Sequence, residues 1–273
     1  MTNHTTDLVH CLTIGSSDSS GGAGVQGDIR ALGAMGAYAA TVLVGITAQD
    51  TRQIRRRYGL PLTLIADQLE TVLADIRIDA IKVGTTWNDG VIHLLSERLR
   101  HVHVPIIVDP VMGTASGVGL GGRSRAIAAL RSQLLPLATV VTPNVFEARR
   151  LVGDAADTDV AVLAQRVAAT GASAVLITDA LPDGGDWLFD GQHHHPIPGT
   201  RVAAGCDHGA GCAHSAVLAA LLGRGVGLLA AARSAHRMVA AGVECGARDV
   251  GHGHHPVDLM AGIGGSAPGL DCG

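Results

Sequence analysis

The fold is decided by residues 80–110, which read AIKVGTTWNDGVIHLLSERLRHVHVPIIVDP. The first five of them, AIKVG, are a short apolar run that is typical of a buried strand. Residues 89–99 carry apolar side chains at helical spacing, and VPIIVDP at 104–110 is a second apolar run. This order predicts two parallel strands joined by a crossover helix.

The same alternation continues in both directions along the chain. We expect further strands at 12–15, 40–46, 139–141 and 174–177, a small strand pair within 186–197, and helices at 24–35, 62–76, 123–135, 145–152, 160–169, 212–222 and 228–243. The pattern favours a three-layer α/β fold, with a mostly parallel central sheet and helices on both faces. No linker, repeat or charge block divides the chain, so we expect one domain over 1–259 and a flexible tail over 260–273.

Composition excludes several classes of protein. The 273 residues carry 20 basic and 24 acidic side chains, and the formal charge of −4 argues against electrostatic capture of nucleic acid. The chain has two Trp, two Tyr and two Phe, too few for a base-stacking surface. Because 47% of the residues are hydrophobic, intrinsic disorder is excluded as well.

Neither a targeting segment nor a membrane span is predicted. The first ten residues, MTNHTTDLVH, lack both a basic start and an apolar stretch. The most apolar later region, 213–232, is interrupted by a histidine, an arginine and three glycines. The five cysteines are odd in number and form no CxxC pair, which is typical of a reducing compartment. We therefore expect a cytoplasmic protein that contacts no membrane.

Gly-rich and polar loops follow the first predicted strands, at the edge of the sheet where α/β proteins bind ligands. The glycines of residues 15–28, GSSDSSGGAGVQGD, let the backbone approach a ligand just before a helix. Such glycines can also have the purely structural role of allowing the chain to turn. TAQDT at 47–51 contains Gln49. Its amide offers a donor and an acceptor side by side to a heteroaromatic ring, or it is an ordinary turn residue.

Acidic side chains follow two later strands. Asp109 ends a fully apolar strand, where a carboxylate needs a cation nearby or a capping role. Asn144 and Glu147, in TPNVFEA at 142–148, have a spacing that lets both face a magnesium-phosphate site. The same spacing fits an N-cap with its capping-box acid.

DHGAGCAHSA at 207–216 opens an Ala-rich helix. The N–H groups of Ala210, Gly211 and Cys212 are expected to point at an anion, helped by the helix dipole. The same position is expected to lower the pKa of the Cys212 thiol from about 8.5 towards a value useful for a base. A buried, inert cysteine is the alternative.

Together these loops resemble the hydroxymethylpyrimidine/phosphomethylpyrimidine kinases of thiamine biosynthesis, within the ribokinase-like superfamily. The resemblance spans about residues 12–256 and rests on LTIGSSDSSGGAGVQGDIRALGAMGAY, TAQDT, VDPVM, TPNVFEA and DHGAGC, which follow one another in family order. The cysteine that ends DHGAGC distinguishes the chain from sugar kinases, which place an aspartate there. Some bacterial pyridoxal kinases share the cysteine.

The resemblance implies phosphorylation of 4-amino-5-hydroxymethyl-2-methylpyrimidine by Mg-ATP, and then of its monophosphate to the diphosphate, by a homodimer. By residue match, Gln49 would hold the aminopyrimidine edge and Asp28 the polar substituents. Gly15 and Val111 would line the ring.

The remaining matches concern the phosphate side. Asn144 would organise ATP with Glu147 and Asp109, which are the implied Mg²⁺ ligands. Cys212 would take the proton from the attacking oxygen. The amides of residues 209–212, which are Gly209, Ala210, Gly211 and Cys212, would stabilise the transferring phosphoryl group.

Two lysines of the family pattern are missing. Thr114-Ala115-Ser116 follows the aspartate-proline strand where a lysine is usual, and Thr178-Asp179-Ala180 stands where Lys-Gly-Gly is usual. Lys82, the one lysine of the chain, lies at a different, structural position of the family pattern. Arg30 and Arg123 are candidate replacements for the missing cations.

Two alternatives therefore stay open. The first is a kinase of the same fold that acts on pyridoxal or a related hydroxymethyl heterocycle, because Thr85 replaces a methionine that packs on the pyrimidine in the family pattern. The second is a weakly active or inactive pyrimidine-binding relative, because the phosphate-contacting lysines are missing.

Overall fold

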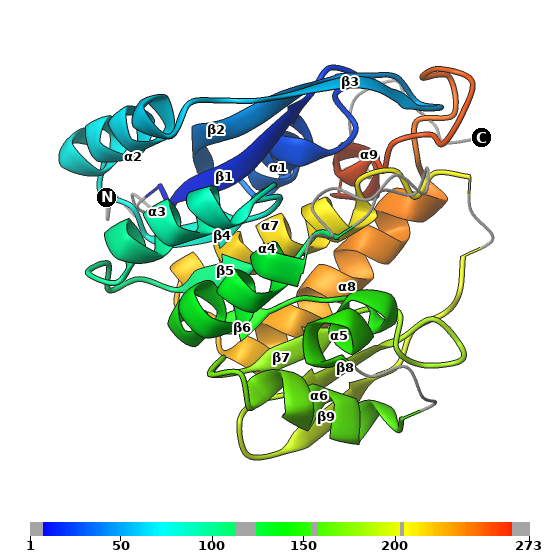
Figure 1. The fold of residues 1–273 in the computed structure, drawn as a ribbon. Helices are drawn as coiled ribbons and strands as arrows, with labels where there is room; N and C mark the ends of the chain where they lie inside the picture. The colour runs from blue at the N-terminus through cyan, green and yellow to red at the C-terminus, as the bar shows by residue number, and fades with distance from the viewer. Residues whose placement is uncertain (1–7, 113–123, 154–157, 203–204, 264–273) are drawn as a thin grey trace, which may run out of the picture.

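The computed structural model describes residues 8–112, 124–153, 158–202 and 205–263. Nine strands of these residues form one sheet in the order β3-β2-β1-β4-β5-β6-β7-β8-β9 (Figure 1). They are β1 (His10–Asp18), β2 (Tyr38–Gln49), β3 (Ile54–Gly59), β4 (Ala80–Val83), β5 (Ile106–Val108), β6 (Val140–Val141), β7 (Val175–Ile177), β8 (Asp186–Phe189) and β9 (His194–Ile197). The strands from β2 to β7 pair in parallel, which confirms the predicted mostly parallel sheet.

Both edges of the sheet are antiparallel. At one edge, β8 and β9 are the predicted strand pair, and β8 pairs with β7. At the other edge, β3 pairs with β2 and was not predicted. Its sequence, IRRRYG, shows no alternation of apolar and polar side chains, because nearly all of them are exposed. Only the pairing with β2, which no local pattern reveals, makes this segment a strand.

Helices cover both faces of the sheet (Figure 1). They are α1 (Gly24–Ala34), α2 (Leu62–Asp75), α3 (Asp89–Leu99), α4 (Ser124–Ala129), α5 (Val145–Val152), α6 (Val160–Ala168), α7 (Ala210–Gly223), α8 (Leu228–Glu244) and α9 (Leu259–Ile263). Helices α2 to α6 enclose one apolar core, and α1, α7, α8 and α9 enclose the other. Strand β1 contributes to both cores, because Leu12 and Ile14 face the first and Cys11 faces the second. The three-layer prediction is confirmed.

Most predicted helices are found close to their expected bounds, and α3 and α5 match them. The stretch predicted as one helix over 123–135 differs. Its described part is α4, followed by a π-helical turn at Leu130–Leu134 and a 3₁₀ turn at Leu135–Leu137. Pro136 lies in this last turn, and a proline has no N–H to continue an α-helical ladder.

The order of the strands reverses beside β1. From β1 the chain passes through α1 to β2 on one side, whereas β4 lies on the other side of β1. At such a reversal, loops leave the carboxyl ends of neighbouring strands in opposite directions and open a crevice. The pairing of β1 with β2 also shifts between Gly15 and Ser16, next to the end of β1.

The chain continues as α9 through the first residues of the stretch that we expected to be a flexible tail. This helix packs against α8 and α1, and Leu259 is buried there. Residues 264–273 lie outside the described residues. In the part of the chain that the structure describes, no helix is long and apolar enough to cross a bilayer.

Candidate active site

A cavity of about 200 Å³ opens at the carboxyl ends of the parallel strands, as the fold predicts. Its walls come from the ends of β1 and β2, the loops after β4, β5, β6 and β7, and the start of α7. The predicted site residues that line it are Gln49, Asp109, Val111, Asn144, Glu147, Gly209, Gly211 and Cys212. Ala210 lines a neighbouring cavity instead. Gly15 lines neither, because it precedes the register shift in β1, and its neighbour Ser16 takes that place.

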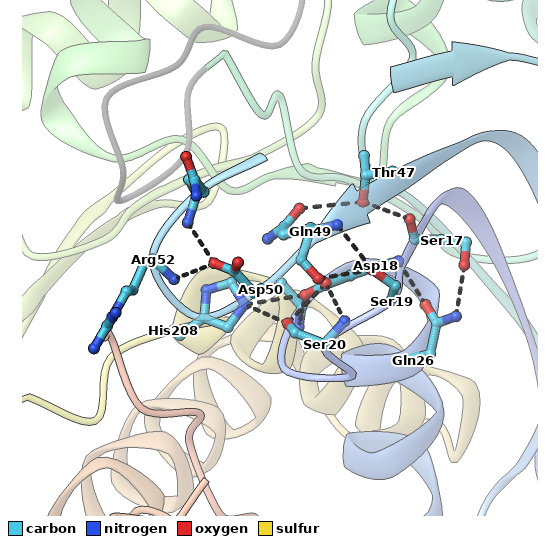
Figure 2. Close-up of polar contacts among 12 residues, drawn as sticks. Ser17, Asp18, Ser19, Ser20, Gln26, Thr47, Gln49, Asp50, Arg52 and His208 are labelled. Carbon is cyan, nitrogen blue, oxygen red and sulfur yellow. Dashed lines mark hydrogen bonds and ion pairs between the residues drawn. The ribbon is translucent and has the colours of Figure 1, made fainter. Parts of the chain in front are cut away.

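Asp18 organises the loop after β1 (Figure 2). Its carboxylate accepts hydrogen bonds from the N–H and the hydroxyl of Ser20, at 2.8 Å each, and from the N–H of Ala23 at 2.9 Å. His208 Nε2 lies 3.0 Å from the same carboxylate. Burial raises the pKa of Asp18, but these contacts outweigh burial and hold the pKa below its ordinary value. Asp18 is therefore an ionised link between the loop after β1 and the loop before α7.

We predicted that Gln49 lies in the loop beyond the strand. The structure instead makes it the last residue of β2. Ser19 fixes its backbone, because the Ser19 hydroxyl donates to the Gln49 carbonyl at 2.7 Å and accepts from its N–H at 2.8 Å (Figure 2). Thr47 Oγ1 lies 3.2 Å from Gln49 Oε1. The side-chain amide is thus oriented at the cavity wall, and its Nε2 group has no hydrogen-bond partner among the described residues.

Gly209 brings the start of α7 against the loop after β1. Its φ is +82°, and a Cβ atom at this position would lie 1.9 Å from the carbonyl oxygen of Gly22. Only glycine fits this contact. The N–H of Ala210 donates to the Asp207 carbonyl at 3.0 Å, so the prediction that this amide faces an anion is wrong. Gly211 and Cys212 lie in the first turn of α7, where N–H groups have no intrahelical partner and can bind an anion.

The Cys212 thiol lines the cavity as predicted, but its pKa differs from the prediction. Burial raises the pKa to about 12, and the nearby Lys82 ammonium opposes this shift without cancelling it. The expected lowering by the helix N-terminus is wrong, because desolvation of a buried thiolate is the larger effect. The resting side chain is therefore a neutral thiol.

Beneath the cavity, the one lysine of the chain forms a buried network of charges. Lys82 Nζ lies 2.9 Å from both carboxylate oxygens of Asp28 and 4.0 Å from Asp109 Oδ2. The Thr13 hydroxyl also donates to Asp28. Asp28 has no exposed surface and does not line the cavity, so its predicted contact with the substrate is wrong. Its carboxylate neutralises Lys82 instead.

Asn144 and Glu147 serve both as a helix cap and as cavity wall. Asn144 Oδ1 accepts from the N–H of Glu147 at 2.9 Å, and Glu147 Oε2 accepts from the N–H of Asn144 at 3.1 Å. This is the capping box that the sequence allowed. Glu147 Oε1 accepts a third bond, from the N–H of Met112 at 3.1 Å. The Asn144–Glu147 pair is thus a capping box whose side chains also line the cavity, so the cap does not exclude a role at a magnesium-phosphate site.

Glu147 and Asp109 are two buried carboxylates that disfavour each other's charge. Burial first, and then the charge of Asp109, raises the pKa of Glu147 to about 7. Burial also raises the pKa of Asp109, against the effect of Lys82. A cation bound between them would remove this repulsion, and Mg²⁺ is commonly held by one or two carboxylates together with phosphate oxygens. The two side chains fit Mg²⁺, although the described residues contain no group of three or more His, Cys, Asp or Glu that could hold a metal.

A second cavity, of about 450 Å³, adjoins the first. Asn144, Thr178, Asp207 and Gly211 line both cavities. Apolar side chains form one wall of the second cavity, which includes Val202, Val239, Ala240 and Val243. A concave site of this size, apolar with a few polar groups, suits the nucleoside of a nucleotide whose phosphates extend towards the start of α7.

Of the two arginines that we considered as replacements for the missing lysines, only Arg30 can be tested against the structure. Residues 114–116 and Arg123 lie outside the described residues. Arg30 lies 4.0 Å from Asp258 and lines neither cavity, so it does not replace a phosphate-contacting lysine.

The loop after β7, where Lys-Gly-Gly was missing, carries its own ion pair. Thr178 lines both cavities, and Asp179 has a φ of +50°. Arg201 Nη2 lies 2.9 Å from Asp179 Oδ1, and both residues line the second cavity. Arg201 therefore brings a positive charge to this cavity, but Asp179 compensates that charge.

Sequence analysis missed the contact between Asp18 and His208. Both residues stand inside the loops that we singled out, so the residue types were visible. The hydrogen bond joins positions 190 residues apart and forms only because Gly22 and Gly209 let the two loops touch. A charged residue in each Gly-rich loop was the one available signal.

Comparisons with known proteins give consistent matches. A family described as phosphomethylpyrimidine kinase matches residues 18–258. A hydroxymethylpyrimidine/phosphomethylpyrimidine kinase of Rhizobium meliloti is 38% identical over 253 residues, which are 90% of this chain and 95% of that protein. The enzyme of the same name from Escherichia coli is 35% identical, over 91% of this chain and 96% of its own length.

Solved structures agree with these matches. The pyridoxal kinase of Staphylococcus aureus, in complex with AMP-PCP and pyridoxal, superposes with a TM-score of 0.82 at 32% identity, covering 93% of this chain and 94% of that one. The phosphomethylpyrimidine kinase of Clostridium difficile superposes with a TM-score of 0.74 at 29% identity, covering 84% and 96%.

Proposed function

The chain belongs to the phosphomethylpyrimidine kinase family, and we propose that it transfers the γ-phosphoryl group of ATP to the hydroxymethyl oxygen of 4-amino-5-hydroxymethyl-2-methylpyrimidine. The monophosphate is then phosphorylated to the diphosphate. The protein is thus a phosphotransferase of thiamine biosynthesis with a ribokinase-like fold.

One observation supports this assignment most strongly, namely that Gln49 and Cys212 line the same cavity. The amide of Gln49 is placed to pair with the aminopyrimidine edge. The first turn of α7, with Cys212, lies where the hydroxymethyl group would meet the phosphoryl group. Phosphoryl transfer depends mainly on positioning of the reactants and on neutralisation of charge. A cavity that binds the ring at Gln49 and the phosphoryl group at the first turn of α7 meets the first of these needs.

The first turn of α7 stabilises the phosphoryl group during transfer. The N–H groups of Gly211 and Cys212, with the positive end of the helix dipole, are donors that are fixed before the reaction begins. The hydrogen bond between Asp18 and His208 holds this turn against the loop after β1. ATP supplies the phosphoryl group, and the second cavity takes its nucleoside.

Mg²⁺ is the metal that suits the pair of Asp109 and Glu147. It would neutralise phosphate charge at the point where the two cavities meet. Asn144 holds the Glu147 carboxylate in place through the capping box. With the raised pKa of about 7, Glu147 loses its proton more readily once a cation is near.

Cys212 accepts the proton of the attacking hydroxyl. A neutral thiol cannot do this, so Cys212 must first release its own proton to solvent before it accepts the proton of the hydroxyl. The Lys82 ammonium and the backbone N–H of Gly24 are the groups that favour a thiolate here. The proton then passes to sulfur as the oxygen–phosphorus bond forms and the bond from the γ-phosphorus to the ADP oxygen breaks.

Pyridoxal is the competing substrate. Thr85 lines the cavity where the family pattern has a methionine, and a pyridoxal kinase shares the fold. We nevertheless assign the pyrimidine, because relatives matched over nearly their whole length are named hydroxymethylpyrimidine/phosphomethylpyrimidine kinases. The family resemblance further implies a cytoplasmic homodimer, which stays a prediction.

Replacement of Gln49 by leucine tests the recognition of the pyrimidine. Loss of two neutral hydrogen bonds is expected to raise KM for hydroxymethylpyrimidine about 5- to 100-fold. The kcat at saturating substrate and the KM for ATP are expected to stay nearly unchanged, because the proposed role of Gln49 is to contact the ring and not the phosphates. Steady-state kinetics with both substrates measures all three constants.

Gln53→Leu is the matched control for this variant. Gln53 is exposed on the same hairpin and lines neither cavity, so its replacement should leave every constant unchanged. An unaltered KM for the pyrimidine in Gln49→Leu would show that another residue reads the ring.

A further inference from the structure

The segment 250–257, which reads VGHGHHPV, lies between α8 and α9 and lines neither of the two cavities. One end of it contacts Thr51, in the turn between β2 and β3. The Thr51 hydroxyl oxygen accepts from the N–H of His252 at 3.1 Å and from the N–H of Gly253 at 3.0 Å. The Thr51 carbonyl accepts from the N–H of His254 at 2.9 Å. One residue thus binds three successive backbone N–H groups of the segment.

Glycines let the segment approach Thr51 this closely. Gly251 has a φ of +74°, and a Cβ atom there would lie 2.4 Å from Thr51 Oγ1. A Cβ atom on Gly253 would lie 2.2 Å from the Thr51 carbonyl oxygen. A larger residue at either position would push the segment away from the turn. The contact therefore depends on two glycines as well as on the hydroxyl of Thr51.

The other end of the segment pairs with the loop before α7. The N–H of His208 donates to the His255 carbonyl at 3.1 Å, and the N–H of Val257 donates to the His208 carbonyl at 3.1 Å. The N–H of His255 donates to the Gly205 carbonyl at 2.8 Å. This end therefore fixes the backbone of the residue that precedes Gly209, at the start of α7.

The segment connects the recognition side of the proposed active site with the transfer side. Thr51 follows Gln49 by two residues, within a turn that Asp50 closes through two hydrogen bonds of 2.9 Å. His208 precedes Cys212 by four residues, and both line the first cavity. A displacement of the segment from Thr51 would therefore affect both the turn that carries Gln49 and the loop that leads into α7.

We propose that Thr51 is a positioning residue for phosphoryl transfer, because it holds Gln49 and the first turn of α7 in place through this segment. The inference rests on the proposed function. Thr51 lines neither cavity, so it acts through the residues that would bind the pyrimidine and the phosphoryl group. The loop after β1 already contacts both Gln49 and His208, and the segment is a second connection between the two.

Replacement of Thr51 by valine keeps the size of the side chain and removes the hydroxyl. It is expected to raise KM for hydroxymethylpyrimidine about tenfold, on the order of one net hydrogen bond. Unlike Gln49→Leu, it is also expected to lower kcat about 3- to 10-fold, because a small displacement of the first turn of α7 slows transfer. Thr51→Ser retains the hydroxyl and should restore both constants to nearly the wild-type values.

Hydrogen exchange of the full chain without substrate, followed by mass spectrometry, measures the connection without turnover. In Thr51→Val, the amides of His252 and Gly253 lose their acceptor and are expected to exchange about tenfold faster. The amide of His208, at the other end of the segment, is expected to exchange faster as well. The change at His208 distinguishes a connection through the segment from a local effect at the turn.

Gly253→Ala breaks the same contact from the side of the segment, because its Cβ atom would meet the Thr51 carbonyl oxygen. It should show the same changes, and the double variant with Thr51→Val should be little worse than either single variant. Thr63→Val is the matched control, since Thr63 is exposed on α2 and lines neither cavity. It should behave as the wild type does. Thermal unfolding, followed in parallel, shows whether each variant is folded at the assay temperature.

The inference is overturned if folded Thr51→Val and Gly253→Ala keep the KM, the kcat and the exchange at His208 of the wild type. A higher KM alone, with unchanged kcat and unchanged exchange at His208, would overturn it too, because the effect would then be confined to the turn. Wild-type protein that phosphorylates no pyrimidine would refute the proposed function. Faster exchange at His208 in the two variants would even then support the connection through the segment.

Discussion

Replacement of Cys212 by alanine is expected to lower kcat for pyrimidine phosphorylation by about 10²- to 10⁴-fold, the usual contribution of a positioned base. The side chain lines the cavity in the first turn of α7, and no other thiol of the described residues lines either cavity. Binding of Mg-ADP should change little, because the backbone amides that face the phosphates remain. Steady-state kinetics and calorimetry separate the two effects.

The pH dependence of the wild type provides the second part of this prediction. Because burial raises the pKa of the thiol to about 12, the thiolate fraction near neutrality is small and grows about tenfold per pH unit. With ATP saturating, kcat/KM for the pyrimidine should therefore rise with pH between 7 and 9. Cys212→Ala should lose this slope together with its rate.

Cys11→Ala is the matched control. Cys11 is a buried thiol of β1, and burial raises its pKa to about 12 as well, but it lies outside both cavities. This variant should keep the rate and the pH slope of the wild type. A Cys212→Ala enzyme with normal kcat would exclude the thiol as the base and leave positioning and amide donors as the whole of catalysis.

Replacement of Lys82 by methionine is expected to lower the free energy of unfolding by about 3–5 kcal/mol, the usual effect of removing one partner of a buried ion pair. Asp28 and Asp109 would then be buried without their cation. The double variant Lys82→Met/Asp28→Asn should recover part of the loss, since its amide still accepts the bond from Thr13. Urea unfolding of the wild type and the two variants measures the three free energies of unfolding.

The sign of the pH effect follows from Lys82 itself. Burial lowers the pKa of Lys82, but the carboxylates of Asp28 and then Asp109 outweigh burial and raise the pKa above its ordinary value. A raised lysine pKa contributes stability that is fully present below the unfolded pKa and is lost only as the pH rises through the folded one. The deficit of Lys82→Met should therefore be constant between pH 6 and pH 9.

Arg77→Met provides the surface comparison for Lys82. Arg77 Nε lies 3.4 Å from Asp79 Oδ1, but the arginine side chain is 66% exposed, and such pairs contribute at most about 1 kcal/mol. If Lys82→Met were no less stable than Arg77→Met, the buried network would not hold this part of the sheet together.

The order of elements could be predicted from the sequence because buried parallel strands and amphipathic helices have distinct apolar patterns. Residues 80–110 show this, since β4, α3 and β5 are all found there. Strand β3 could not be predicted, because three arginines occupy its exposed positions and only its partner β2 defines it. The α-helical pattern over 123–135 likewise could not show where a π-helical turn begins.

The candidate site could be predicted as a set of loops but not as contacts. Loops at the carboxyl ends of parallel strands converge, so Gln49, Glu147 and Cys212 meet in one cavity. The direction in which a helical side chain points could not be predicted from the sequence. Asp28 is the last residue of the Gly-rich stretch 15–28, yet helix α1 turns its side chain inward to Lys82.

Desolvation and distant pairings explain the other differences. The sequence places Cys212 at a helix N-terminus but does not show that the thiol is partly buried in the cavity wall, and this desolvation raises its pKa. Nothing local connects Thr51 with His252 and Gly253, which lie 201 and 202 residues further along the chain. Only the alternation of glycine and histidine in VGHGHH, which is typical of neither a helix nor a strand, marks this segment as unusual.

Product analysis by mass spectrometry tests the central claim most directly. Purified protein with Mg-ATP would receive hydroxymethylpyrimidine, its monophosphate and pyridoxal in parallel reactions. The account predicts pyrimidine diphosphate from both pyrimidines, which would show that the missing lysines are replaced or dispensable. Pyridoxal phosphate alone, or no product from folded protein that binds Mg-ADP, would contradict it.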